Sequence, residues 1–191
     1  MKLVLIRHGQ GEHTLDIPRS LQIEDPSLTT KGAEQAKLLI NQIPLTNKDI
    51  IIISPIRRTL ETAFIWSENI DCWKIVSPLV SPRMFPIRPD KSTLPCDKII
   101  DLEIIKNDYP TFEIDMKVPL NIWSDGINTL PENQFTKLAE EFIADCKQLQ
   151  KENIYIVSHD GTITSYRQMI SGQSLTRNDF LQETGWIQIS C

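Results

Sequence analysis

The chain has 191 residues, of which 40% are hydrophobic and 24% are charged. This length and composition allow one globular domain with a substantial core, which excludes a disordered protein and a small disulfide scaffold. Acidic residues outnumber basic ones by 25 to 20, and the net charge is -5. A general nucleic-acid surface needs a basic excess, so any anion bound here must be held by a local cluster of cations.

Short apolar runs alternate with helical patterns along the chain. The runs that predict strands are residues 3–6, 50–53 and 154–157, with shorter candidates at 73–76 and 186–189. The helical patterns are residues 31–42, 57–69, 131–151 and 162–170. This alternation predicts an α/β fold, a three-layer, doubly wound, mostly parallel sheet with helices on both faces.

Prolines concentrate in one part of the chain, since eight of the twelve lie between residues 78 and 131. This composition predicts an irregular insertion or lid over residues 79–130, near one edge of the sheet. A segment of that length should carry short elements of its own. The whole chain, residues 1–191, is expected to form a single domain.

No apolar run is long enough to span a bilayer, and the N-terminus lacks a signal-peptide pattern, so we expect a cytoplasmic protein. The four cysteines show no paired spacing, which favours reduced thiols over disulfides or a zinc site. Neither nucleic acid nor membrane is expected as a partner, and a homodimer is compatible with the sequence.

Histidine and arginine side chains follow the ends of the three main predicted strands. The first strand ends in Arg7-His8-Gly9, the second is followed by Arg57 and Arg58, and the third by His159 and Asp160. Ligands bind beyond the carboxyl ends of strands in open α/β sheets, so these residues should converge. Two imidazoles and two guanidiniums would form a pocket for a small dianion, of which phosphate is the obvious example.

Four motifs in this order resemble the histidine phosphatase superfamily, which has the phosphoglycerate mutase-like fold. They are Arg7-His8-Gly9, Leu28-Thr29-Thr30-Lys31-Gly32-Ala33-Glu34-Gln35-Ala36, Ser54-Pro55-Ile56-Arg57-Arg58-Thr59-Leu60-Glu61-Thr62-Ala63, and Val157-Ser158-His159-Asp160-Gly161. The resemblance implies a phosphatase that hydrolyses a small phosphomonoester through a phosphohistidine, without a metal or other cofactor. Alternatives are phosphoryl transfer within a sugar-acid phosphate, as in phosphoglycerate mutase, and a phosphate-binding relic without catalysis.

The resemblance also implies a role for each matching residue. His8 would be the nucleophile, and Arg7, Arg58 and His159 would complete the phosphate pocket. Gln10 and Thr14 lie where the family places substrate-contacting side chains. His13 fits equally well as a wall of the substrate entrance or as a structural loop residue.

The position at which the family carries the acid that protonates the leaving oxygen is occupied differently in this sequence. Many of these phosphatases use a glutamate two residues after a leucine that follows the third strand, but here Leu79 is followed by Val80 and Ser81. Asp97 in the insertion and Asp160 beside His159 are the two replacements. Asp97 is preferred because Asp160 could instead serve the start of the following helix.

The insertion also carries cations that could hold a second anionic group of the substrate, namely Arg83, Arg88 and Lys91. Their ordinary interpretation is solvated surface charge. A metal site built from His8, His13 and His159 is disfavoured, because the neighbouring arginines would repel a divalent cation.

Overall fold

The computed structural model describes residues 1–88, 90 and 92–191, and in this part of the chain six strands form one sheet in the order β4-β3-β2-β5-β1-β6. The strands are β1 (Lys2–Arg7), β2 (Ile50–Ile53), β3 (Trp73–Val76), β4 (Glu113–Ile114), β5 (Asn153–Ser158) and β6 (Trp186–Ser190). Neighbouring strands pair in parallel, except that β6 runs antiparallel to β1. The predicted mostly parallel sheet is therefore confirmed.

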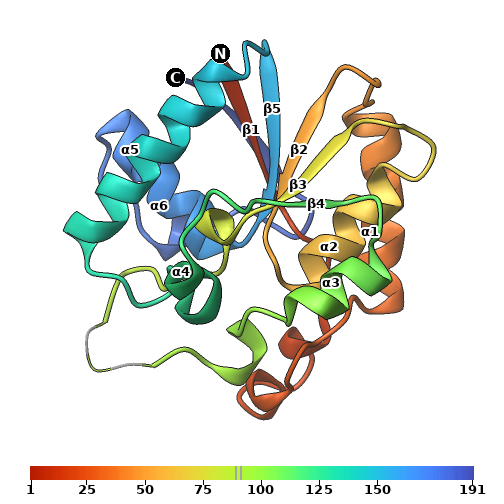
Figure 1. The fold of residues 1–191 in the computed structure, drawn as a ribbon. Coiled ribbons are helices and arrows are strands. Elements are labelled where there is room, and N and C mark those ends of the chain that lie inside the picture. Colours follow the sequence, from red (N-terminus) through yellow and green to blue (C-terminus); the bar gives the residue numbers. More distant parts are fainter. Residues whose placement is uncertain (89, 91) are drawn as a thin grey trace.

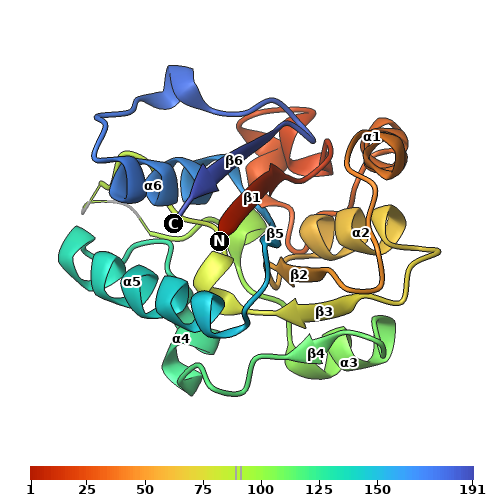
Figure 2. The same ribbon diagram turned by 90° about the horizontal axis from the view of Figure 1, so that it is seen from above.

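Helices cover both faces of this sheet, as Figure 2 shows, with α1 and α2 on one side and α5 and α6 on the other. The helices are α1 (Thr30–Gln42), α2 (Arg57–Trp66), α3 (Leu102–Asp108), α4 (Leu120–Asp125), α5 (Glu132–Gln148) and α6 (Asp160–Ser171). The three-layer α/β prediction is confirmed. None of the helices in the described part of the chain is long and apolar enough to cross a membrane.

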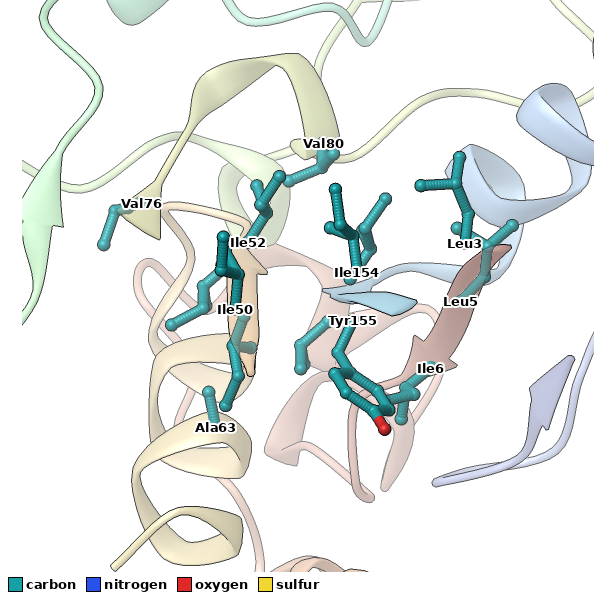
Figure 3. Packing of buried hydrophobic residues seen from close by; sticks show 14 of the residues in the cluster. Leu3, Leu5, Ile6, Ile50, Ile52, Ala63, Val76, Val80, Ile154 and Tyr155 are labelled. Atoms are coloured by element: carbon teal, nitrogen blue, oxygen red, sulfur yellow. The ribbon is translucent and has the colours of Figure 1, made fainter. Parts of the chain in front are cut away.

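The core lies between the central strands and the helices packed on them (Figure 3). All four residues of β2 are buried, as are residues 154–158 of β5. These strands have apolar side chains on both faces because helices cover both faces of the sheet. By contrast, the edge strand β6 alternates exposed and half-buried residues. Three of the four cysteines are also buried, and all four are free thiols.

The proline-rich segment over residues 79–130 contributes to the sheet as well as to its surroundings (Figure 1). It contains α3, α4 and the two-residue strand β4, which pairs with β3 at the sheet edge. Ile105 of α3 and Trp123 of α4 are buried in the main core. A short 3-10 turn, Pro95–Asp97, lies along the chain between β3 and α3. The side chain of Asp97 and the carbonyl oxygen of Cys96 reach the site described below.

The loop after β1 packs directly against the start of α1. A Cβ atom added to Gly32 would lie 2.1 Å from the carbonyl oxygen of Gln10, and one added to Gly9 would lie 2.5 Å from the carbonyl oxygen of Gly32. Thr29 caps the helix by accepting a hydrogen bond from the Gly32 N–H. Two glycines therefore allow a backbone contact that fixes the loop carrying His8.

Candidate active site

His8 follows the carboxyl end of β1 and is 3% exposed. Its Nδ1 lies 2.6 Å from the carbonyl oxygen of Gly9, and the Nε–H of Arg58 points at its Nε2 from 3.2 Å. A guanidinium can only donate, so Nε2 accepts and the ring proton sits on Nδ1, where it is donated to Gly9. The lone pair of Nε2 therefore faces the arginine.

His159 follows β5 and occupies the N-cap position of α6. Its ring centroid lies 5.1 Å from that of His8. Arg58 donates from Nη2 to Nδ1 of His159 at 3.2 Å, so the proton on Nε2 is donated to Oγ of Ser54 at 2.8 Å. The end of β2 thus sets the tautomer of a histidine that follows β5.

Arg58 joins the parts of the site. It is the second residue of α2 and is 2% exposed. Besides the two histidines, its Nη1 donates to the carbonyl oxygen of Cys96 at 2.6 Å and its Nη2 to Oδ1 of Asp97 at 2.8 Å. One buried guanidinium therefore brings together residues that follow β1 and β5 with the 3-10 turn of the insertion.

Arg7 and Asp160 form a second charged pair beside the histidines. Nη2 of Arg7 lies 3.0 Å from Oδ2 of Asp160, and Nη1 donates to the carbonyl oxygen of Leu181 at 2.6 Å. The Nε of Arg7 is buried without a hydrogen-bond partner in the described part of the chain. Asp160 does not cap α6; it is the first helical residue, and it accepts a hydrogen bond from the Gly161 N–H.

Burial and arginine charge keep the imidazoles neutral. Burial, together with the positive charge of Arg58, lowers the pKa of His8 and of His159 well below the usual value. For His13, burial and then Arg58 lower the pKa to about 3. The positive charge of the site is therefore carried by arginines, and neutral histidines are left free to act as nucleophile and hydrogen-bonding groups.

The remaining predicted residues lie at different distances from this centre. The His13 ring centroid is 5.5 Å from that of His8, and the buried Nδ1 of His13 has no partner in the described part of the chain. Gln10 and Thr14 bond within the loop region instead. Oε1 of Gln10 accepts from Thr29, and Thr14 donates to the carbonyl oxygen of Gly11.

Two positioning side chains were not predicted. Ser54 orients His159 as described above, while Oγ1 of Thr62 accepts from the Gly9 N–H at 3.1 Å and donates to the carbonyl oxygen of Arg58 at 2.6 Å. Both side chains are fully buried. Their presence in the third motif, Ser54 to Ala63, is the available signal, but that motif does not indicate which contacts they make.

The expectation that Arg83 could bind a second anionic group is wrong. Arg83 is buried, donates to the carbonyl oxygens of Ile127 and Leu130, and forms an ion pair with Glu132 at 2.8 Å. These contacts hold the segment before α5 in place and leave the guanidinium of Arg83 occupied. Arg88 lies on a cavity described below, and Lys91 lies outside the described residues. No group of three or more His, Cys, Asp or Glu side chains that could hold a metal ion occurs among the described residues.

The model of the histidine phosphatase superfamily (branch 1) matches residues 3–80. The chain is 38% identical over 63 residues to phosphoserine phosphatase 1 of Hydrogenobacter thermophilus, a match covering 33% of this chain and 29% of that protein. A putative phosphoserine phosphatase 2 of the same organism is 27% identical over 177 residues, covering 91% of this chain and 80% of the other.

Solved structures show the same fold. The alpha-ribazole phosphatase of Shigella flexneri superposes with a TM-score of 0.64 over 100% of this chain and 90% of its own, at 22% identity. At 22% identity, the superposition shows that the two proteins share a fold.

Proposed function

This chain belongs to the histidine phosphatase superfamily, a class of phosphoryl-transfer enzymes, and from that premise we propose that it hydrolyses a small phosphomonoester through a phosphohistidine at Nε2 of His8. One observation carries the proposal. The buried guanidinium of Arg58 contacts the reactive nitrogen of His8, the second histidine and the carboxylate of Asp97. A nucleophile, an oxyanion-binding group and an acid are thereby held around one point.

In the first step, Nε2 of His8 attacks phosphorus while the bond from phosphorus to the leaving oxygen breaks. The neutral ring supplies the electron pair, since its proton is held on Nδ1 by Gly9. Negative charge on the phosphoryl oxygens is stabilised by donors of Arg58 and by the Nε–H of Arg7, which has no hydrogen-bond partner among the described residues. The leaving oxygen takes a proton from a carboxylic acid and departs as an alcohol.

In the second step, water attacks the phosphohistidine and the bond from Nε2 to phosphorus breaks. The carboxylate that gave up its proton now accepts one from the water. Inorganic phosphate leaves and His8 returns to its neutral form. The same acid therefore serves both halves of the reaction.

The geometry favours Asp97 over Asp160 as this acid. Asp97 is bound to the guanidinium that also contacts the reactive nitrogen of His8. Asp160 is bound to Arg7 and to the Gly161 N–H at the start of α6. Asp160 thus holds Arg7 in place, a role that does not require it to exchange a proton.

The substrate class is a small phosphorylated metabolite. In support, similar proteins are named as phosphoserine phosphatases and an alpha-ribazole phosphatase. The cavity lined by Asp97 and Asp160 has a volume of ≈ 570 Å³, which is the size of a small-molecule site.

The decisive experiment is a turnover assay with 4-nitrophenyl phosphate on the wild type and His8→Ala, with circular dichroism to show that both are folded. We expect the substitution to lower kcat by more than about 1,000-fold. Rapid quenching of the wild type with ³²P-labelled substrate should trap an acid-labile, alkali-stable phosphoprotein that His8→Ala does not form. Turnover should persist in EDTA. Near-native activity of His8→Ala, or a wild type that binds phosphate without turnover, would refute the proposal.

A further inference from the structure

A cavity of ≈ 570 Å³ opens beside the two candidate acids, and both Asp97 and Asp160 line it. Its volume lies within the range of small-molecule sites and exceeds what a phosphoryl group alone requires. Since the leaving group must depart past the proton donor, this cavity is where the rest of the substrate would lie.

In the part of the chain that the structure describes, two arginines at this cavity have no acidic partner. Arg88 comes from the insertion and Arg177 from the 3-10 turn after α6, and neither forms an ion pair among the described residues. Arg83, which also lines the cavity, is paired with Glu132, and Asp97 of the lining is paired with Arg58. Although the chain has a net charge of -5, the lining of this cavity therefore carries a local excess of positive charge.

Aromatic and apolar side chains form the walls between these charges. Phe85 and Phe180 approach with ring centroids 6.1 Å apart, and Leu21 also lines the cavity. The guanidinium carbon of Arg177 lies 5.6 Å from the centre of the Phe180 ring, close enough for a cation–π interaction. Phe180 precedes Leu181, whose carbonyl oxygen accepts from Arg7. The segment that fixes Arg7 therefore also places Arg177.

We propose that this cavity binds the leaving group, and that Arg177 with Arg88 selects leaving groups in which a planar or apolar body ends in a second anionic group, such as a carboxylate. The phosphoryl group would be held by Arg7 and Arg58, the body by Phe85 and Phe180, and the second charge at the rim. This inference rests on the proposed function, because it assigns the leaving group of that reaction.

The test compares two esters of similar shape, 4-carboxyphenyl phosphate and the neutral 4-carbamoylphenyl phosphate. We expect the wild type to favour the carboxylate in kcat/KM, and Arg177→Gln to reduce that preference about tenfold, as the loss of one charge-assisted contact predicts. Arg88→Gln should reduce it as well. Lys137→Gln, on the exposed face of α5, removes the same charge away from the cavity and should leave the preference unchanged.

Several results would overturn the inference. They are a wild type without preference for the carboxylate, an unchanged preference in Arg177→Gln, and an equal loss in Lys137→Gln, which would indicate the overall field of the protein. An unchanged preference in Arg88→Gln would remove Arg88 from the site. Titration calorimetry of both esters with His8→Ala measures the same preference as binding. Turnover of 4-nitrophenyl phosphate reports separately on the proposed reaction.

Discussion

Nη2 of Arg58 donates to Oδ1 of Asp97 at 2.8 Å, so the candidate acid is held by the guanidinium that also contacts Nε2 of His8. Oxygens of an incoming phosphoryl group would compete with Asp97 for these donors. Binding of substrate would then weaken the ion pair between Arg58 and Asp97. The carboxyl group would be left beside the leaving oxygen at the point where a proton is needed.

Asp97→Asn separates leaving groups by their need for a proton. For an alkyl phosphate we expect kcat to fall by about 100-fold, because the alkoxide cannot leave unprotonated. For 4-nitrophenyl phosphate the loss should stay below about tenfold in the first step. Steady-state and burst kinetics with the two substrates provide the measurement. Asp160→Asn serves as the matched variant, and the same leaving-group dependence there instead would assign the acid to Asp160.

Ser54→Ala removes the acceptor that receives the Nε2 proton of His159. The ring would lose its fixed tautomer, and we expect kcat for 4-nitrophenyl phosphate to fall by about 10- to 100-fold, as is typical for an orienting partner. Ser67→Ala is the control, because Ser67, the C-cap residue of α2, is also buried and its hydroxyl donates to the carbonyl oxygen of Ala63, away from the histidines. Equal activity of the two variants would show that Ser54 has no positioning role.

The convergence of His8, Arg58 and His159 could be predicted from the sequence for a physical reason. Each follows a strand whose apolar run is unmistakable, and parallel strands end at the same edge of a sheet. Since β5 lies between β1 and β2, the residues after all three strands are neighbours. The convergence of these residues could therefore be predicted without information about distant contacts.

Other features depend on contacts that leave no local signal. The acceptors on Cys96 and Leu181 are backbone carbonyls, which any residue would supply. The sequence around Arg83 does not distinguish it from an arginine on the surface. In the structure it is buried against Phe135, with its guanidinium carbon 4.0 Å from the ring centre. Strand β4 is too short to give a periodic pattern. In each case tertiary packing decides the outcome.

Gly32→Ala should disturb the site through the backbone. The new Cβ would lie 2.1 Å from the carbonyl oxygen of Gln10, so the loop carrying His8 must shift. We expect the free energy of unfolding to fall by about 1–3 kcal/mol and kcat to fall as well. Urea unfolding and 4-nitrophenyl phosphate turnover measure the two effects. Lys37→Ala, at an exposed position of the same helix, is the control, and wild-type behaviour of Gly32→Ala would contradict the close packing.

The buried histidines should make stability depend on pH. Burial and arginine charge lower the folded-state pKa of His8, His13 and His159, while in the unfolded chain each titrates near 6.5. As pH falls below 6.5, the unfolded chain binds protons that the folded protein does not. The contribution of these groups is therefore complete above pH 6.5 and is lost as pH falls toward their folded-state values, at up to about 1.4 kcal/mol per pH unit for each histidine.

His13→Gln measures the contribution of one of these histidines to the pH dependence of stability. Between pH 7.0 and 5.5 the wild type should lose about 1 kcal/mol more of its free energy of unfolding than the variant does. Urea unfolding in a buffer without phosphate gives the comparison, because bound phosphate would stabilise the folded state and change the linkage. His13 is the suitable choice because its pKa falls to about 3, so it stays neutral in the folded protein across this range. Equal losses in both proteins would mean that His13 is protonated in the fold, and the neutral imidazole beside His8 would have to be abandoned.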